Sequence, residues 1–278
     1  MAREHELTPY YDSGGITIYH GDNVETLQTF PADCVDLTVT SPPYDNLRTY
    51  GGHSWDFEGV ASELWRVTKP GGVVVWVVAD ATVDGSETGS SFRQALRFMD
   101  IGFRLNDTMI FEKRMVFQPT KDVPRYYQTH EYMFILSKGK PASFNPICDI
   151  KNNCAGERSK VYAGNSAYND RINIGAEFTI KDYRRRGSVW KYSTGKNHSS
   201  KDSIVVGHTA IFPEALARDH ILSWSNEGDT VLDPFSGSGT TLKMAKETGR
   251  TGIGVEIEDR YCAIAANRLR QSVLNFGE

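Results

Sequence analysis

The chain has 278 residues, of which 39% are apolar and 24% are charged. These values are typical of a soluble globular protein and predict one large domain, or one catalytic domain with a modest insert. The mean hydropathy is -0.43 and no apolar stretch is long enough to cross a bilayer, which excludes a membrane-spanning protein. The N-terminus lacks the basic start and apolar run of an export signal, so we expect a cytoplasmic location.

The four cysteines, Cys34, Cys148, Cys154 and Cys262, have spacings that match neither a disulfide framework nor a zinc site. We therefore expect reduced, structural cysteines and no bound metal. The net charge of -4 argues against a protein that is basic all over, although a local basic region can exist within an acidic average.

Short β-branched runs alternate with helical or turn-rich connections along most of the chain. Several of these runs are apolar on both faces, as expected for strands of a mainly parallel sheet covered by helices on both sides. The sequence thus predicts an α/β fold with a Rossmann-like, seven-stranded, mainly parallel sheet. The predicted strands are 16–20, 35–40, 72–78, 107–111, 131–136, 230–233 and 252–256, and the predicted helices include 57–67, 92–99, 213–224 and 241–248.

The periodic pattern is lost between residues 145 and 205. This segment is rich in Asn, Gly, Ser and Lys and contains eleven basic residues against six acidic ones. It is either a separate recognition insert or a mobile surface segment. We interpret 1–144 and 206–278 as the two halves of one catalytic domain and 145–205 as an insert for recognition.

The most informative segment predicts a strand, a glycine-rich turn and a helix. Strand 230–233 ends in Asp233 and leads into the turn Pro234-Phe235-Ser236-Gly237-Ser238-Gly239-Thr240. Glycine lets a backbone approach a ligand closely, and α/β proteins bind ligands at the carboxyl ends of their parallel strands. Glu256 ends the next strand, 23 residues after Asp233, where a βαβ unit places a carboxylate to accept both hydroxyls of a ribose. The pattern indicates a nucleoside site.

The glycine-rich turn lacks the usual phosphate-binding residues, and this indicates which kind of nucleoside it binds. It has neither the G-x-G-x-x-G pattern nor a Walker lysine, both of which bind phosphate groups. Asp233 would repel a pyrophosphate but could pair with an ammonium group, which fits the amino acid part of S-adenosylmethionine. The alternative is a glycine turn that merely joins a strand to a helix.

Strand 35–40 leads directly into Ser41-Pro42-Pro43-Tyr44 and so ends at the same edge of a parallel sheet. Two prolines stiffen this loop and remove two N–H donors, which leaves carbonyl oxygens with an aromatic ring beside them. Ser41 Oγ and the Pro42 carbonyl could accept the two protons of a planar exocyclic amine while Tyr44 stacks on an extruded base. Drawing both protons out of the plane of the base localises the nitrogen lone pair, which conjugation otherwise spreads into the ring, and makes the amine a nucleophile.

Ser41-Pro42-Pro43-Tyr44 followed by Asp233-Pro234-Phe235-Ser236-Gly237-Ser238-Gly239-Thr240-Thr241 resembles the amino-methyltransferases of DNA. The order of the motifs is that of the β class, in which the catalytic motif precedes the target recognition region and the cofactor motif follows it. The resemblance covers nearly the whole chain. It implies a Rossmann-like fold, S-adenosylmethionine as cofactor, double-stranded DNA as partner, a flipped target base and, as is common in the family, a homodimer.

The resemblance also implies roles for single residues. Asp22 approaches the cofactor adenine, the segment from His208 to Pro213 lines the methionine side, and Glu256 binds the ribose. The candidate catalytic residues are Ser41, Pro42, Pro43 and Tyr44; the candidate cofactor residues are Asp22, His208, Phe212, Pro213, Asp233, Pro234, Phe235, Gly237, Gly239, Thr240 and Glu256.

Two departures from the family pattern leave alternatives open. Ile211-Phe212-Pro213 replaces a segment that often has Lys or Gln before its proline, which puts the cofactor contacts of that turn in doubt. Ser41 stands where adenine-N6 enzymes commonly have Asp; Ser is frequent in cytosine-N4 enzymes but also occurs with adenine. The widespread occurrence of adenine targets slightly favours adenine N6, and cytosine N4 is the alternative.

Three other functions fit the sequence less well. A carbon-5 cytosine enzyme needs a nucleophilic cysteine, and none of the four cysteines lies in a suitable loop. Methylation of RNA or of a protein amide is a second enzymatic alternative, and a DNA-binding regulator without turnover is a third.

The segment 145–205 interleaves its basic residues with six aromatic rings, a mixture that suits a surface reading duplex DNA better than a solvated loop. Arg184-Arg185-Arg186 is its densest basic part, where we expect phosphate contacts before base contacts. The candidate DNA-binding residues are Arg48, Arg184, Arg185, Arg186 and Lys191.

Overall fold

The computed structural model describes residues 8–43, 55–114, 124–163, 172–193 and 212–271. The chain divides into two compact units. The first consists of Met1–Asn145 together with Ser188–Glu278, and the second of Pro146–Gly187.

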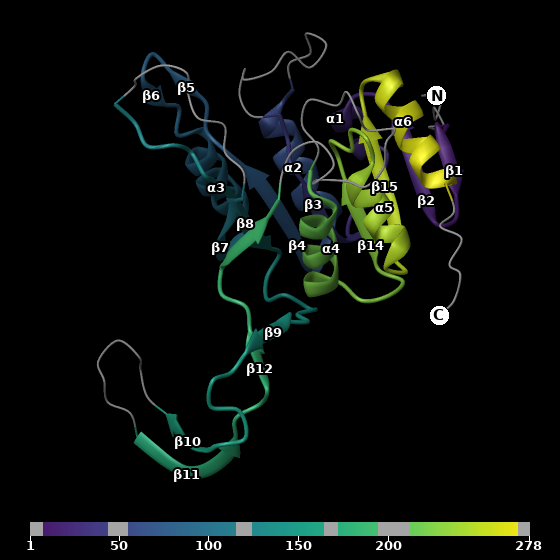
Figure 1. The fold of residues 1–278 in the computed structure, drawn as a ribbon. Coiled ribbons are helices and arrows are strands. Elements are labelled where there is room, and N and C mark those ends of the chain that lie inside the picture. The colour runs from purple at the N-terminus through teal and green to yellow at the C-terminus, as the bar shows by residue number, and fades with distance from the viewer. Residues whose placement is uncertain (1–7, 44–54, 115–123, 164–171, 194–211, 272–278) are drawn as a thin grey trace. The chain divides into compact units, whose positions relative to one another are not determined.

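A nine-stranded sheet forms the centre of the first unit (Figure 1). It contains all seven predicted strands, so the predicted α/β class is confirmed, but β1 and β13 add two edge strands and correct the predicted number. Five neighbouring pairs are parallel and three are antiparallel. In sheet order, the strands are β1 (Tyr11–Ser13), β2 (Ile16–His20), β15 (Thr251–Glu256), β14 (Thr230–Asp233), β3 (Val35–Thr40), β4 (Thr68–Val78), β8 (His130–Ser137), β7 (Arg104–Lys113) and β13 (Val189–Tyr192).

The direction of the chain through the sheet reverses between β3 and β14. From β3 the chain moves to β4 on one side, and from β14 it moves to β15 on the other. Because these strands are parallel, their carboxyl ends lie at one edge of the sheet. A crevice outside such a switch point is where open α/β sheets bind ligands.

Helices cover both faces of this sheet (Figure 1). One set packs around α2, which connects β3 to β4, and the other packs around α5, which connects β14 to β15. The first set comprises α1 (Asn23–Gln28), α2 (Phe57–Val67) and α3 (Ser90–Ile101); the second comprises α4 (Glu214–Trp224), α5 (Thr240–Glu247) and α6 (Asp259–Arg270). A short hairpin of β5 (Thr82–Val83) and β6 (Ser86–Glu87) lies between β4 and α3 in the sequence.

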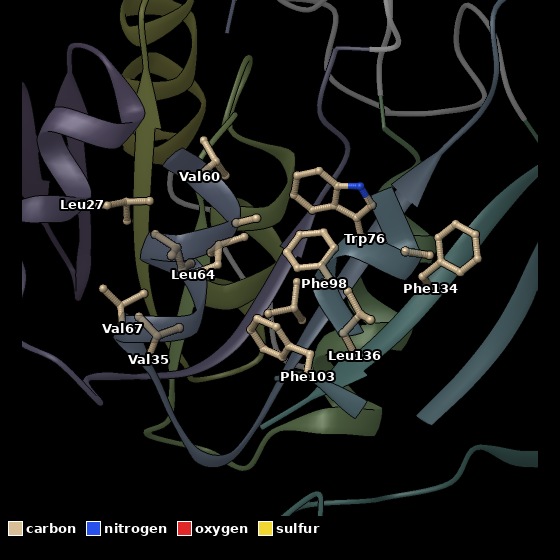
Figure 2. Close-up of a cluster of buried hydrophobic side chains, with 14 of the residues drawn as sticks. Leu27, Val35, Val60, Leu64, Val67, Trp76, Phe98, Phe103, Phe134 and Leu136 are labelled. Carbon is tan, nitrogen blue, oxygen red and sulfur yellow. The ribbon is translucent and has the colours of Figure 1, made fainter. Parts of the chain in front are cut away.

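Figure 2 shows the core between the first set of helices and the sheet. Trp76 is fully buried and meets Phe98 of α3 edge to face, with ring centroids 5.1 Å apart. Its indole N–H donates to Gln94 Oε1 at 2.9 Å, so the large ring is buried without an unpaired donor. Because strand side chains alternate in direction, Val75 and Val77 face the second set of helices, and they too are fully buried. This two-sided burial explains the continuous apolar run of β4.

Helix α4 packs on the opposite face through an uncharged histidine. The imidazole of His220 is fully buried, stacks on Trp190 with centroids 4.7 Å apart, and places Nε2 3.2 Å from Met133 Sδ. Its Nδ1 has no hydrogen-bond partner among the residues that the structure describes. Burial lowers the pKa of His220 to about 3, which keeps the ring neutral near pH 7.

The second unit, Pro146–Gly187, contains two small antiparallel sheets. Strand β9 (Cys148–Lys151) pairs with β12 (Tyr183–Arg185), and β10 (Arg158–Ala163) pairs with β11 (Ile172–Thr179). The predicted insert is 145–205, whereas the compact unit comprises Pro146–Gly187. Val189–Tyr192 pairs in parallel with β7 and so belongs to the large sheet. The recognition role of this unit stays a prediction.

No helix in the described ranges is long and apolar enough to span a membrane.

We predict that His220 makes the protein less stable in acid. Its pKa is about 3 when folded against about 6.5 when unfolded, so unfolding takes up a proton between these values and stability falls as the pH drops below about 6.5. His220→Phe keeps a ring against Trp190 and removes this proton uptake. From pH 7.5 to pH 5, the free energy of unfolding should fall by about 2 kcal/mol less in the variant than in the wild type. Urea denaturation at both pH values measures this, and equal losses would contradict the prediction.

Candidate active site

The carboxyl ends of β3 and β14 are joined by a hydrogen bond between side chains. Thr40 Oγ1 donates to Asp233 Oδ1 at 2.7 Å, although the two residues are 193 positions apart in the sequence. Ser41 follows Thr40 and Pro234 follows Asp233, so the proline-rich loop and the glycine-rich turn both begin at this contact. The structure therefore brings these two predicted segments to one edge, at the switch point of the sheet.

The Asp233 carboxyl is buried, with 5% of the residue exposed. Burial raises its pKa to about 6, against the opposing effect of the hydrogen bonds from the side chains of Thr40 and Thr241 and from the Phe235 N–H. A cationic ligand would stabilise the ionised form. A carboxylate has about four acceptor positions, so these three donors do not exhaust its capacity.

Glu256 ends β15 beside the glycine-rich turn. Its Oε2 accepts the Gly237 N–H at 2.8 Å and its Oε1 accepts the Glu258 N–H at 2.9 Å. Burial is the main cause of a raised pKa of this carboxyl. Both oxygens are thereby oriented, and each keeps a lone pair for a further donor.

The two glycines of the turn have left-handed backbones, with φ of 50° at Gly237 and 76° at Gly239. A Cβ added at Gly239 would come within 2.8 Å of Ala265 Cβ, so close packing on α6 requires glycine there. Thr240, the first residue of α5, is buried and its Oγ1 accepts from Arg268 at 3.2 Å. Gly239 and Thr240 thus have packing roles in addition to the cofactor role predicted for them.

A corner after β2 approaches the same turn. The Asp22 carboxylate caps α1 by accepting the N–H groups of Val24 and Glu25 at 2.8 and 3.0 Å. The neighbouring Asn23 is buried and its Nδ2 donates to the Pro234 carbonyl at 3.3 Å. Sequence reasoning missed Asn23, because a single Asn after a strand has no distinctive spacing.

Phe235 and Pro213 bring apolar surface to the site. Phe235 meets Trp55 edge to face, with centroids 5.0 Å apart. Trp55 was also missed, since it precedes a helix without any motif. Phe212 is half-buried and Pro213 is buried at the start of α4.

Three candidates, Tyr44, Arg48 and His208, lie outside the described residues. Their roles stay predictions.

The basic candidates of the recognition region differ in their surroundings. Arg184 and Arg185 are exposed on β12. Arg186 binds both oxygens of Asp149 through Nε, at 2.9 and 2.8 Å, and this ion pair lowers the pKa of Asp149. Lys191 lies on β13 of the large sheet, where its Nζ is 2.9 Å from Glu112 Oε1. Arg186 and Lys191 are therefore already paired with carboxylates inside the protein.

Comparison with known proteins agrees with this arrangement. Residues 35–267 match the family model N6_N4_Mtase, described as DNA methylase. The chain belongs to this family. It is 52% identical over 244 residues to the orphan methyltransferase M.BamHII of Bacillus amyloliquefaciens, covering 87% of this chain and 91% of that protein. It is 26% identical to the type II methyltransferase M.SmaI of Serratia marcescens, covering 90% and 89% of the two chains.

Solved structures agree on the fold. The PvuII DNA methyltransferase, named as cytosine-N4-specific, superposes with a TM-score of 0.67 at 20% identity, over 98% of this chain and 92% of that chain. A protein of Thermus thermophilus, provisionally named a DNA modification methylase and complexed with S-adenosyl-L-methionine, gives a TM-score of 0.60 at 26% identity, over 93% and 96%.

The predicted family, enzyme class and Rossmann-like fold are confirmed by these matches. The chain is an S-adenosylmethionine-dependent DNA amino-methyltransferase of the N6/N4 family. The homodimer that the resemblance implied stays a prediction.

We predict that Thr40→Val destabilises the protein in a pH-dependent way. The substitution keeps the shape of the side chain but removes the hydrogen bond to Asp233 Oδ1, which costs about 1 to 3 kcal/mol when the acceptor is buried. Because the pKa of Asp233 is about 6, the loss should be larger at pH 7.5, where the carboxylate is charged, than at pH 5. Urea denaturation at both pH values measures the loss.

Two matched variants control for the change of side chain. Thr40→Ser retains the hydroxyl and should keep most of the stability. Thr251→Val makes the same exchange at an exposed position of β15 and should have little effect. If Thr40→Val lost no more than Thr251→Val, the contact would not stabilise the site.

Proposed function

We propose that this enzyme binds S-adenosylmethionine at the carboxyl ends of β14 and β15 and a flipped base at the carboxyl end of β3. The exocyclic amine of that base is the methyl acceptor. The main support is the hydrogen bond from Thr40 to Asp233, since it joins the starts of the two loops that would hold acceptor and cofactor. A ligand crevice is expected at this switch point on topological grounds as well.

The residues at the edge fit the cofactor. Glu256 has two oriented oxygens with lone pairs left for ribose hydroxyls, and Asp233 is a buried carboxyl that a cationic group would stabilise. Phe235 supplies apolar surface beside them. When bound, S-adenosylmethionine supplies an electrophilic methyl group attached to a sulfonium.

The proline-rich loop is proposed to orient and polarise the amine. Ser41 Oγ and the Pro42 carbonyl accept its two protons, and Tyr44 stacks on the base. Ser41 follows β3 directly and the next residue, Pro42, is buried, so the loop begins from a rigid strand. Catalysis then depends on positioning and on localisation of the nitrogen lone pair, without a covalent intermediate on the protein.

The target is adenine N6 or cytosine N4. The widespread use of adenine in this class favours the first, whereas Ser41 in place of Asp favours the second. A hydroxyl and a carboxylate can both accept an amine proton, so the product has to be identified directly.

The unit Pro146–Gly187 is proposed to read the DNA duplex. Arg184 and Arg185 are exposed basic residues on a two-stranded ribbon, which suits contacts with phosphates and with base edges. Arg186 is paired with Asp149, and its contact with DNA stays a prediction. Since its substrate is DNA, we place the enzyme in the cytoplasm with it.

Transfer of tritium from methyl-labelled S-adenosylmethionine tests the function. Duplex DNA, RNA and protein are offered separately, and the labelled DNA is digested and chromatographed. We expect counts in N6-methyladenine or N4-methylcytosine from DNA. Label in RNA or protein only would refute the proposal, and cofactor binding without incorporation into any substrate would favour a non-catalytic regulator.

Tyr44→Ala tests the stacking role. Loss of stacking costs about 1 to 3 kcal/mol per base, so turnover should fall by about one to two orders of magnitude. The dissociation constant for S-adenosylmethionine, measured by calorimetry, should change little. Tyr10→Ala, at a partly exposed tyrosine beside β1, is the control and should leave both quantities unchanged. Weaker cofactor binding in Tyr44→Ala would mean that the stacking role is misassigned.

Arg184→Ala tests the recognition unit. If Arg184 neutralises a phosphate, the variant should bind DNA more weakly and the slope of log K against log salt should become shallower by about one. Arg97→Ala removes an exposed arginine of α3 that is paired with Glu58, and serves as control. An unchanged salt slope in Arg184→Ala would mean that Arg184 does not contact a DNA phosphate.

A further inference from the structure

The C-terminal helix α6 contains a buried arginine. The side chain of Arg268 is 0% exposed. Burying a guanidinium is costly unless its N–H groups are paired, so the partners of Arg268 indicate why it is there. Neither the motifs nor the predicted site residues include it.

The partners of Arg268 belong to two different segments of the proposed cofactor site. Its Nη1 donates to the Ser238 carbonyl at 2.6 Å and to Thr240 Oγ1 at 3.2 Å, both in the glycine-rich turn. Its Nη2 donates to Glu214 Oε1 at 2.8 Å. Glu214 is the first residue of α4 and directly follows Pro213. One planar guanidinium therefore connects the turn to the segment that contains Phe212 and Pro213.

The same helix limits the turn by packing. Ala265 lies one turn before Arg268 on α6 and leaves no room for a side chain at Gly239. On the other side, Lys243 of α5 places Nζ 3.0 Å from Glu214 Oε1. The Glu214 carboxylate is thus held by two cations from two helices, and it is well compensated for its partial burial.

We propose that Arg268 is a positioning residue for the cofactor, which acts through the main chain of the glycine-rich turn and through Glu214. It holds the turn and the Phe212–Pro213 segment in their binding arrangement before the ligand arrives. This inference rests on the proposed cofactor site. Ordering the two segments in advance removes an entropic cost that binding would otherwise meet, so the effect should appear in cofactor affinity. The partners of Arg268 named above, Ser238, Thr240 and Glu214, belong to the proposed cofactor site, so we expect the effect in cofactor affinity and not in DNA affinity.

The test compares Arg268→Gln, Arg268→Lys and Glu214→Gln with wild type in the full-length protein. Calorimetry gives the dissociation constant for S-adenosylmethionine, a duplex-binding assay gives that for DNA, and circular dichroism verifies that each variant is folded at the measuring temperature. Arg270→Gln is the matched control, because Arg270 is an exposed arginine on the same helix.

We expect Arg268→Gln to weaken cofactor binding by about tenfold or more and Arg268→Lys by less, since lysine keeps the charge but loses the fork. DNA affinity should stay within about twofold. In turnover assays, KM for the cofactor should rise while kcat at saturating cofactor stays within about threefold. Glu214→Gln should also weaken cofactor binding. The Arg268→Gln/Glu214→Gln double variant should bind the cofactor little more weakly than Arg268→Gln alone, because both substitutions break the same ion pair between Arg268 and Glu214.

Other outcomes separate the possible failures. If wild type bound no S-adenosylmethionine, the proposed function would be wrong. Wild-type cofactor affinity in the folded variants, equal losses of cofactor and DNA affinity, or an equal loss in Arg270→Gln would each overturn the role of Arg268 and leave the proposed function standing. If Arg268→Gln does not fold, Arg268→Lys and Glu214→Gln decide the question by the same criteria.

Discussion

A carboxyl group buried at the switch point of the sheet is the constraint on which the site depends. Asp233 ends one half of the parallel sheet, and the hydroxyl that pairs with it, Thr40, ends the other half. Burial makes the charge of this carboxyl costly, as its pKa of about 6 reflects, and the hydrogen bond from Thr40 offsets part of that cost. This hydrogen bond thus connects the carboxyl ends of β3 and β14. The proline-rich loop and the glycine-rich turn begin one residue after this contact, so the contact fixes the relative position of their first residues.

The rest of the first unit makes that position rigid. Strand β4 is apolar on both faces, with Trp76 packed among α2 and α3 on one side and Val75 and Val77 facing the other helices. Such close packing allows little relative movement of β3, β4 and β14, whereas the loops at their ends are free to specialise. Polar side chains then hold the glycine-rich turn through its backbone. Asn23 donates to the Pro234 carbonyl, and Arg268 donates to the Ser238 carbonyl. Core burial provides the scaffold, and individual hydrogen bonds shape the site upon it.

The unit Pro146–Gly187 follows a different physical principle. Pro146–Gly187 consists of small two-stranded sheets with many exposed residues, and its charged side chains form local pairs such as Arg186 with Asp149. Its basic charge is concentrated in a protein whose net charge is -4. The local concentration of basic charge matters more than the net charge of the whole protein, because salt confines electrostatic attraction to about 10 Å at ordinary ionic strength. The family to which the chain belongs acts on DNA, and a basic ribbon within an acidic protein is suited to that substrate.

The amino-acid sequence by itself determined the fold class, the seven inner strands and the two motifs, because apolar periodicity and Pro/Gly spacing act over neighbouring residues. It also indicated that Ser41 follows one parallel strand and that Asp233 ends another, so that both lie at the same edge of the sheet. Tertiary structure alone decided that β13 joins the large sheet, that Arg186 pairs with Asp149, and that Arg268 is buried under the glycine-rich turn. Each of these depends on which partner lies opposite in space, and a sequence pattern records the type of a residue but not the group that compensates its charge or its hydrogen bonds.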